Sequence, residues 1–301
     1  MSRRVAITGA SGFIGSSVAA ALGARGDVAV PVRRPYDLDT LTATFRGVDV
    51  VIHLAGVVSA VREEDFYTAN VDATRIVARA AHDAGKRLVH ISSLAAAGPA
   101  PASAPRSESD PPAPITTYGR SKLEGERAVA FESAPTGLDW IILRPGVVYG
   151  PRDNAMRPLF ASARHGLLPL VGSPTAAYTF IFIDDAVAAI LAAIERGGGG
   201  EIVFVGHQQP VTPSDLLETI RAAINPSARI LRLPRALVRV AASVGDWAGA
   251  ATGKPATINS RRYVELYSPG FVCRVDRMRE QLGVVARVDL RDGIARTMAS
   301  L

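Results

Sequence analysis

Tyr118 and Lys122 are four residues apart, so a helix through them would place both side chains on one face. A tyrosine hydroxyl ordinarily titrates at about pH 10. A nearby ammonium favours the phenolate, which predicts a lowered Tyr118 pKa and proton exchange near neutral pH. Ser93, which follows the apolar run Arg87–Ser92, could hold a carbonyl oxygen beside the tyrosine. The spacing of Tyr118 and Lys122 alone also fits an ordinary amphipathic helix. Because Ser93 adds a second hydroxyl, the three residues together form a candidate catalytic group.

Three glycines with the spacing G-x-x-G-x-x-G separate the apolar run Arg4–Thr8 from a helical pattern. Glycine permits a tight turn and lets the backbone approach a pyrophosphate closely. The free N–H groups at the start of the following helix favour the anion. The pattern therefore predicts a dinucleotide-binding loop. The residues assigned to its cofactor contacts are Gly9, Ser11, Gly12, Phe13, Ile14 and Gly15.

The residues after the second apolar run are expected to select the cofactor. In a dinucleotide-binding fold, an acid at this position binds the ribose 2′-hydroxyl of NAD, whereas an arginine accommodates the 2′-phosphate of NADP. Arg33 and Arg34 follow the run Asp27–Val32, and no acid occurs between them and Asp37. The pattern favours NADP, with NAD as the alternative, although two solvated surface arginines would give the same sequence.

The link between Arg34 and Asp37 is only two residues long, which leaves little room for a helix and a further strand. Without that strand, Asp27–Val32 lies at the edge of the sheet. An edge position would also explain Pro31, because proline cannot donate a hydrogen bond to a neighbouring strand. We therefore expect nothing longer than a bridge of two or three residues to pair on the outer side of this run.

Short apolar runs alternate with helical patterns over the first two thirds of the chain, as in a parallel sheet flanked by helices. The expected strands are Arg4–Thr8, Asp27–Val32, Val48–His53, Arg87–Ser92, Asp139–Leu143 and Glu201–Val205. The expected helices include Phe13–Arg25, Asn70–Ala84, Tyr118–Phe131 and Asp184–Arg196. The predicted fold class is α/β, a Rossmann-type doubly wound parallel sheet with a smaller, mostly helical C-terminal substrate domain.

Residues 1–154 and 178–208 are assigned to the dinucleotide-binding domain, and residues 155–177 and 209–301 to the substrate-binding portion. Thr212, with Pro213 and an acid at the third helical position, predicts the start of a helix that ends near Ile224. Another helix is expected from Pro234 to about Ala251. Its apolar stripe consists of Leu237, Val238, Ala241, Val244 and Ala248. Core packing is expected for this stripe, with an apolar substrate or a membrane as the alternative.

The segment Gly98–Thr117 is rich in proline, alanine and serine and shows no periodicity. A loop of this length inside a domain is usually functional or mobile. Because it lies between two candidate catalytic residues, a substrate lid is expected, and a disordered surface insert is the alternative.

Several motifs, in this order and spacing, resemble the extended short-chain dehydrogenase/reductase family of NAD-dependent epimerase/dehydratase type, over nearly the whole chain. They are Thr8-Gly9-Ala10-Ser11-Gly12-Phe13-Ile14-Gly15, Asp49-Val50-Val51-Ile52-His53-Leu54-Ala55-Gly56, Asn70-Val71, Ser92-Ser93, Tyr118 with Lys122, and Leu143-Arg144-Pro145-Gly146-Val147-Val148-Tyr149-Gly150-Pro151. The resemblance implies a Ser93–Tyr118–Lys122 triad in which the tyrosine exchanges the proton while hydride passes to or from the nicotinamide. The short link before Asp37 is similar to the dTDP-4-dehydrorhamnose reductase branch.

The same resemblance implies further cofactor contacts. Asp37 and Leu38 would border the adenine. Leu54, Ala55 and Gly56 would line the cofactor, together with Tyr118 and Lys122. The residues expected beside the nicotinamide are Pro145, Gly146 and Val148.

The substrate is less well marked. The segment Arg144–Val147 resembles reductase and hydroxysteroid-type members. Sugar-nucleotide members often have an asparagine there, and an arginine before the strand matching Phe180–Ile183, where this chain has neither. In favour of a sugar nucleotide, Asp110–Pro114 resembles bacterial sugar epimerases. Four arginines could also clasp a diphosphate, namely Arg152, Arg157, Arg261 and Arg262.

We therefore expect an NAD(P)-dependent oxidoreductase acting on a carbonyl or secondary alcohol. The alternatives are a nucleotide-sugar epimerase, dehydratase or 4-keto reductase, and a cofactor-binding protein without turnover. The last class typically loses the tyrosine or the lysine, and both are present here.

Composition limits the remaining possibilities. The net charge is +6, but the arginines are scattered without a basic run, so a nucleic-acid partner is not expected. A single cysteine, Cys273, excludes a disulfide within the chain, argues against a thiolate metal site and favours the cytoplasm. No metal site and no membrane span are expected, and a homodimer is possible by resemblance. His53 and Cys273 are expected to be structural, and the Asp184-Asp185 pair to be charges at a helix start.

Overall fold

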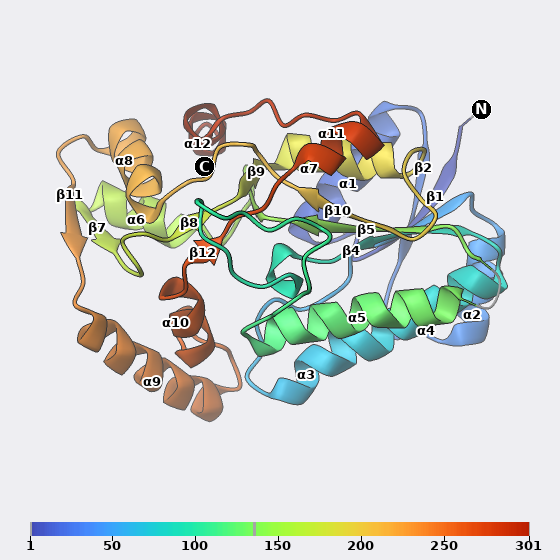
Figure 1. Cartoon of the computed structure of the whole chain (residues 1–301), viewed down its shortest axis with the longest axis horizontal. Coiled ribbons are helices and arrows are strands. Elements are labelled where there is room, and N and C mark those ends of the chain that lie inside the picture. The colour runs from blue at the N-terminus through green and yellow to red at the C-terminus, as the bar shows by residue number, and fades with distance from the viewer. Residues whose placement is uncertain (1, 135–136, 301) are drawn as a thin grey trace.

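The structure is a computed structural model that describes residues 2–134 and 137–300. Its centre is a six-stranded sheet in the order β10-β5-β4-β3-β1-β2 (Figure 1). The strands are β1 (Arg4–Thr8), β2 (Val28–Val32), β3 (Val50–His53), β4 (Arg87–Ile91), β5 (Trp140–Pro145) and β10 (Glu201–Val205). All neighbouring strands pair in parallel. The six expected strands are thus confirmed, as is the predicted fold class.

Strand β2 lies at the edge of this sheet, as the short link predicts. Within the described residues it pairs only with β1, and Pro31 stands opposite Ile7. The link nevertheless leads into a helix that the sequence analysis did not anticipate, α2 (Leu38–Arg46). Its N-cap is Asp37, whose carboxylate accepts a hydrogen bond from the Thr40 N–H at 2.9 Å. The chain therefore crosses directly from β2 through α2 to β3.

Helices cover both faces of the sheet (Figure 1). One face carries α1 (Phe13–Ala24) and α7 (Ile183–Ala193), which contact each other, and α11 (Asp276–Leu282). The other face carries α2, α4 (Ala73–Asp83) and α5 (Thr117–Ser133). Alternate residues of β1 serve the two layers, since Val5 and Ile7 pack into one core and Ala6 into the other. Burial on both faces explains why the strands are almost continuously apolar.

The smaller part of the chain is mostly helical, as expected. Its elements are α6 (Arg157–Arg164), α8 (Pro213–Ile224), α9 (Arg235–Thr252), α10 (Ser260–Leu266) and α12 (Leu290–Met298), with the paired strands β7 (Leu167–Leu170) and β11 (Arg229–Arg232), and β8 (Ala177–Tyr178) and β12 (Gly270–Phe271). Strands β6 (Val147–Tyr149) and β9 (Phe180–Phe182) join it to the sheet. The predicted Thr212 cap of α8 is confirmed as a capping box with Asp215. Among the described residues, no helix combines the length and the apolar character needed to cross a bilayer.

The segment Gly98–Thr117 is held in place by the C-terminal part of the chain, so the alternative of a disordered insert is wrong. The Ala100 N–H donates to the Gly270 carbonyl at 3.0 Å, and the Arg106 N–H donates to the Val272 carbonyl at 2.9 Å. Glu108 accepts a hydrogen bond from the Phe204 N–H at 2.9 Å, at the end of β10. The role of a lid stays a prediction.

The expected core packing of the α9 stripe is wrong. Of its five residues, only Val238 is buried, and Leu237, Ala241 and Val244 are exposed. The helix packs instead through Val238, Ala242, Gly245 and Gly249. Small residues allow this close contact, because a Cβ at Gly245 would lie 2.0 Å from the Ile258 carbonyl oxygen. The periodicity thus correctly predicts an amphipathic helix, but the larger side chains point away from the protein.

Candidate active site

The glycine loop between β1 and α1 has no room for side chains at two positions. Gly9 has a φ of +71°, and a Cβ there would lie 2.8 Å from the Ala55 nitrogen. A Cβ at Gly15 would lie 2.1 Å from the Gly9 carbonyl oxygen. Helix α1 begins at Phe13 with no side-chain cap and no acid in its first turn. Its N–H groups and dipole are therefore well placed for a pyrophosphate, so the residues present fit a dinucleotide.

Gly15→Ala is expected to weaken cofactor binding by at least about tenfold, because the methyl group would force α1 away from the loop. The dissociation constant for NADPH, measured by fluorescence, checks this. Gly23→Ala is the matched control within the same helix, since a Cβ at Gly23 meets nothing within 4 Å. Equal affinities for the two variants would contradict the assignment of this loop.

His53, at the end of β3, contacts Thr8 at the end of β1 and Thr74 on α4. Its Nδ1 lies 2.7 Å from the Thr8 hydroxyl and its Nε2 lies 2.9 Å from the Thr74 hydroxyl. Burial and, to a smaller extent, the positive charges of Lys122 and Arg34 together lower the His53 pKa to about 3. A neutral imidazole with both nitrogens bonded is structural, as the sequence analysis expected.

The loop after β3, with Leu54, Ala55 and Gly56, is held by Asn70. The Asn70 Oδ1 accepts a hydrogen bond from the Val57 N–H, and its Nδ2 donates to the Ser121 hydroxyl, both at 2.9 Å. A Cβ at Gly56 would lie 2.8 Å from the same Oδ1. Asn70 belongs to a π-helical turn, Thr68–Asp72, which follows the short helix α3 (Glu63–Tyr67). Asn70 was expected only as part of the Asn70-Val71 motif, and its role in holding this loop was not predicted from the sequence.

Ser93 and Tyr118 are brought together at the carboxyl end of β4. Ser93 caps a short helical turn (Leu94–Ala96), where its hydroxyl accepts from the Ala95 N–H at 3.2 Å, and the same hydroxyl is near enough to Tyr118 to lower the pKa of the phenol. Tyr118 lies in the first turn of α5, which approaches that helical turn closely. A Cβ at Gly119 would lie 2.5 Å from the Ala95 carbonyl oxygen. The two hydroxyl groups of the predicted triad are therefore neighbours.

Lys122, one turn further along α5, is buried behind them. Its Nζ donates a hydrogen bond to the Ile91 carbonyl at 2.8 Å. Burial lowers the Lys122 pKa to about 8, and the nearby Glu126 carboxylate opposes that shift. The ammonium lies close to the cofactor-lining loop, because a Cβ at Gly56 would be 3.8 Å from its Nζ.

The expectation that Lys122 lowers the Tyr118 pKa is wrong in this structure. The Tyr118 pKa is raised to about 12, mainly by burial; the nearby Ser93 hydroxyl acts in the opposite direction, and the charge of Glu265 adds to the rise. Lys122 is not among the groups that shift this pKa, and its ammonium donates to the Ile91 carbonyl instead of to the phenol. The phenol therefore holds its proton throughout the neutral range, which suits a proton donor.

A buried ion pair lies directly below the triad. The Arg144 guanidinium on β5 donates to Glu126 on α5 through Nε at 2.9 Å and through Nη2 at 2.5 Å. Both side chains are about 3–4 % exposed. The Ser92 hydroxyl also donates to Glu126. The pair ties α5 to the ends of β4 and β5, and nothing in the sequence analysis identified it.

The residues expected beside the nicotinamide also come together. Ile14, Pro145 and Val148 line a small apolar pocket with Ile91 and Leu143. Gly146 lies against β9, where a Cβ would be 2.2 Å from the Thr179 carbonyl oxygen. The described residues thus bring the α1 start, the β4 end and the β5–β6 link to one place.

Residues 33–38, which follow the edge strand β2, lie mostly on the surface of the protein. The Arg34 guanidinium lies over the Tyr36 ring, 5.7 Å from its centroid, and donates to the Ala69 carbonyl at 3.2 Å. Arg33 and Leu38 are exposed. The Thr40 hydrogen bonds lower the pKa of the Asp37 carboxyl, which caps α2. Asp37 therefore has a structural role as the N-cap of α2, in addition to the adenine contact that the resemblance implies.

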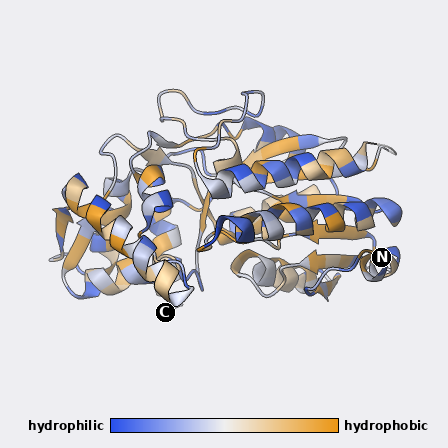
Figure 2. Ribbon diagram, turned by 90° about the horizontal axis from the view of Figure 1, so that it is seen from below, coloured by the Kyte–Doolittle hydropathy of each residue, from blue (hydrophilic) through white to orange (hydrophobic). Residues whose placement is uncertain are grey.

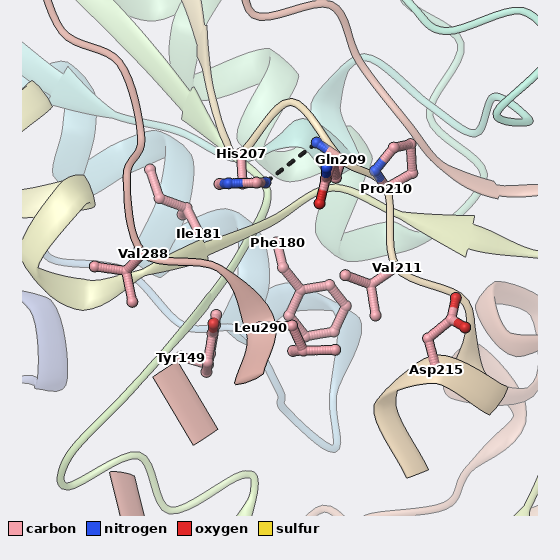
Figure 3. Close-up of a pocket in the computed structure, with 10 residues that line it drawn as sticks. All are labelled: Tyr149, Phe180, Ile181, His207, Gln209, Pro210, Val211, Asp215, Val288 and Leu290. Carbon is pink, nitrogen blue, oxygen red and sulfur yellow. Dashed lines mark hydrogen bonds between the residues drawn. The ribbon is translucent and has the colours of Figure 1, made fainter. Parts of the chain in front are cut away.

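A cavity of about 220 Å³ lies away from the triad, between β6, β9 and α8 (Figure 3). Its lining residues are Tyr149, Phe180, Ile181, His207, Gln209, Pro210, Val211, Asp215, Val288 and Leu290. Its volume is below the roughly 300–1,000 Å³ typical of ligand pockets. No predicted site residue lines it, so we place the candidate active site at Ser93 and Tyr118.

The other structural expectations are confirmed. Asp184 and Asp185 lie in the first turn of α7, and the Asp185 carboxylate accepts from the Arg287 and Val288 N–H groups, both at 2.9 Å. Cys273 is buried and packs with Phe204 and Phe271.

Comparisons with known proteins place the chain among dehydrogenases and epimerases. It is 28 % identical to a ceramide reductase from Caulobacter vibrioides, over 98 % of this chain and 93 % of the relative. It is 27 % identical to 4-hydroxy-2-methyl-3-oxo-4-farnesyl-3,4-dihydroquinoline-1-oxide ketoreductase from Stigmatella aurantiaca, over 97 % and 94 % of the two chains.

A solved structure shares the fold. UDP-glucuronic acid 4-epimerase from Bacillus cereus, in complex with UDP-glucuronic acid and NAD, superposes with a TM-score of 0.78 at 21 % identity, over 99 % of this chain and 98 % of that one. The model of the NAD dependent epimerase/dehydratase family matches residues 5–206, which hold the glycine loop, Ser93, Tyr118 and Lys122. The chain therefore belongs to the NAD dependent epimerase/dehydratase family.

Proposed function

We propose that this protein is an NAD(P)-dependent reductase that interconverts a carbonyl and a secondary alcohol. The observation that carries the proposal is the proximity of the Ser93 and Tyr118 hydroxyl groups at the end of β4, where α5 lies against the turn that Ser93 caps, with Lys122 buried one turn away. A hydroxyl pair of this kind holds a carbonyl oxygen and supplies the proton that it needs. The bound nicotinamide supplies or accepts the hydride.

Each residue then has one task. Ser93 binds the substrate oxygen, and Tyr118 gives it the proton when the carbonyl carbon receives hydride. The raised Tyr118 pKa keeps that proton available at neutral pH and favours the reducing direction. Lys122 holds the ribose and carries positive charge next to the reacting groups, for which a compact ammonium is suited.

We further propose that the cofactor lies along the carboxyl edge of the sheet. The glycine loop would hold the pyrophosphate, Leu54–Gly56 would line the cofactor, and Pro145–Val148 would border the nicotinamide. Residues 1–154 and 178–208 would form this half of the protein, and residues 155–177 and 209–301 would shape the substrate side. The glycine loop and all six strands of the sheet lie in the first set.

The names of two relatives, a ceramide reductase and a ketoreductase, support the reducing reaction. The likeness to a UDP-glucuronic acid epimerase keeps a nucleotide-sugar epimerase as the second candidate. The arginines suited to a diphosphate are partly engaged elsewhere, which favours the first. Arg261 donates to the Ala60 carbonyl at 2.9 Å, and Arg262 pairs with Glu265 at 3.0 Å.

The deciding experiment follows NADPH and NADH oxidation by the purified protein with three substrate panels. These are short aldehydes and ketones, long-chain ketones, and 4-keto nucleotide sugars. We expect oxidation of the reduced cofactor with a non-nucleotide carbonyl. Epimerisation of a UDP-sugar without net cofactor oxidation would overturn the reductase proposal in favour of the second candidate.

The preference for NADP is a proposal that rests on Arg33 and Arg34. Truncating either arginine to alanine is expected to raise the KM for NADPH about 10- to 100-fold and to leave the KM for NADH almost unchanged, because a charged hydrogen bond to the 2′-phosphate is lost. Arg46→Ala, an exposed arginine at the far end of α2, is the control. A parallel loss for both cofactors would count against 2′-phosphate recognition.

A further inference from the structure

Helix α9 presents a continuous apolar face to the surroundings. Leu237, Val240, Val244 and Trp247 recur at helical spacing, and they are 54, 60, 58 and 74 % exposed. Ala241 and Ala251, on the same face, are also exposed. Large contiguous apolar surface of this kind on a folded protein marks an interaction site. Figure 2, seen from below, shows α9 on the near side of the smaller part, with hydrophobic residues along its length.

This exposure is not caused by a loose helix. The opposite face is packed through Val238, Ala242 and the two glycines against the segment that leads into α10. Arg235 stacks over the rings of Tyr263 on α10 and of Tyr267, the residue that follows α10, with its Cζ 5.9 and 4.9 Å from their centroids. The helix is thus fixed to the protein by its small residues, and its large apolar residues are directed outward.

The surroundings of this face are strongly basic. Residues 229–262 contain seven basic side chains and one acid, Asp246, a net charge of +6 that equals the formal charge of the whole chain. The basic residues are Arg229, Arg232, Arg235, Arg239, Lys254, Arg261 and Arg262. All of them except Arg261 are exposed. The remaining chain is neutral overall, so the formal positive charge is concentrated in the stretch of sequence that contains α9.

The face is also connected to the candidate active site. A Cβ at Gly249 on α9 would lie 3.8 Å from the Val61 side chain, and Arg261 on α10 donates to the Ala60 carbonyl. Both contacts are to the loop between Gly56 and α3, which Asn70 holds beside Lys122. The packed side of α9, opposite the apolar face, therefore contacts a loop of the site.

We propose that the α9 face, defined by Leu237, Val240, Val244 and Trp247, binds the surface of an anionic phospholipid bilayer. The apolar side chains would enter the boundary between headgroups and acyl chains, with Trp247 at the interface, where tryptophan is favoured. Exposed basic residues of this stretch, such as Arg239 and Lys254, would contact the lipid phosphates. This binding does not depend on the proposed reaction, and it would hold the protein at the membrane through the helix whose packed side contacts the loop at Ala60 and Val61.

The test measures binding of the full-length protein to vesicles of phosphatidylcholine, alone or mixed with phosphatidylglycerol. We expect binding to the mixed vesicles that falls at high salt, because screening weakens the arginine contacts. A Val240→Gln, Val244→Gln, Trp247→Gln triple variant should bind at least about tenfold more weakly. The reason is that three apolar side chains, which the parent protein would transfer from water into the bilayer, are replaced by polar ones. Phe131→Gln is the matched control, because Phe131 is equally exposed, at 74 %, on α5.

A second measurement does not depend on the fold of the triple variant. The chain has two tryptophans, Trp140 and Trp247. Brominated lipids in the mixed vesicles should quench the fluorescence of the parent protein, and Trp247→Gln should abolish that quenching. The proposal is overturned if the parent shows neither vesicle binding nor quenching. It is equally overturned if sedimentation shows a dimer that the Trp247→Gln substitution dissociates, since a second copy then covers the face.

Discussion

Tyr118→Phe is expected to lower the turnover of carbonyl reduction by about 10²- to 10⁴-fold, the usual effect of removing a positioned proton donor. Phenylalanine keeps the ring against Phe66, 6.4 Å away between centroids, but it has no proton to give. Cofactor binding should change little, because the loss concerns the reacting oxygen. The measurement is a comparison of kcat for NADPH oxidation with the dissociation constant of NADPH.

The pH dependence of the same reaction follows from the direction of the Tyr118 pKa shift. Burial raises this pKa to about 12, so the protonated form that reduction needs persists through pH 6–9. Alcohol oxidation needs the deprotonated form, so its rate should rise with pH over that range. Tyr149→Phe is the control, because the Tyr149 hydroxyl donates to the Asp289 carbonyl outside the triad. Unchanged turnover in the Tyr118→Phe variant would remove the tyrosine from the reaction.

The sheet could be predicted from the sequence because its strands are covered on both faces. A run such as Val50–Ile52 is apolar throughout, and the glycines after β1 fix where the first turn must lie. Helix α2 was missed although Leu41 and Phe45 have helical spacing after the Asp37 cap. The short link was taken to leave little room for both a helix and a strand, whereas the chain omits only the strand.

Tertiary contacts decided what periodicity could not. A helical pattern predicts that α9 has an apolar stripe, but it does not predict which face of the helix packs against the protein. Here Gly245 and Gly249 determine the packed face. Spacing likewise placed Lys122 on the same side of α5 as Tyr118, but it could not show that the ammonium would reach the Ile91 carbonyl. The pKa of Tyr118 is set by burial, which depends on how α5 approaches the end of β4.

The ion pair between Glu126 and Arg144 joins residues that are 18 positions apart, on a helix and a strand, so no local pattern could reveal it. A buried pair is not by itself a large source of stability, because both charges lose their hydration. Removing one partner is different, since the other charge then stays buried without compensation. The two carboxylate oxygens of Glu126 are occupied by Arg144, and the Ser92 hydroxyl adds a third contact.

Glu126→Gln is therefore expected to lower the free energy of unfolding by about 3–5 kcal/mol, a large share of the roughly 5–15 kcal/mol of a typical domain. Urea denaturation of the full chain measures this change. Glu124→Gln, two residues earlier on α5, is the matched control. Its pair with Arg127 is 44–63 % exposed, so its loss should cost less than about 0.5 kcal/mol.

A double variant distinguishes two causes of the lost stability: an Arg144 guanidinium left without its partner, and a site that tolerates no substitution. If the cost arises from an unpaired guanidinium, then adding Arg144→Met to Glu126→Gln should recover part of the lost stability. Additive losses would instead mean that each side chain is needed for packing. The same variants bear on the site, because Glu126 is the charge that opposes the lowering of the Lys122 pKa. Its removal should lower that pKa below about 8 and make the lysine neutral at a pH where the parent protein still keeps it charged.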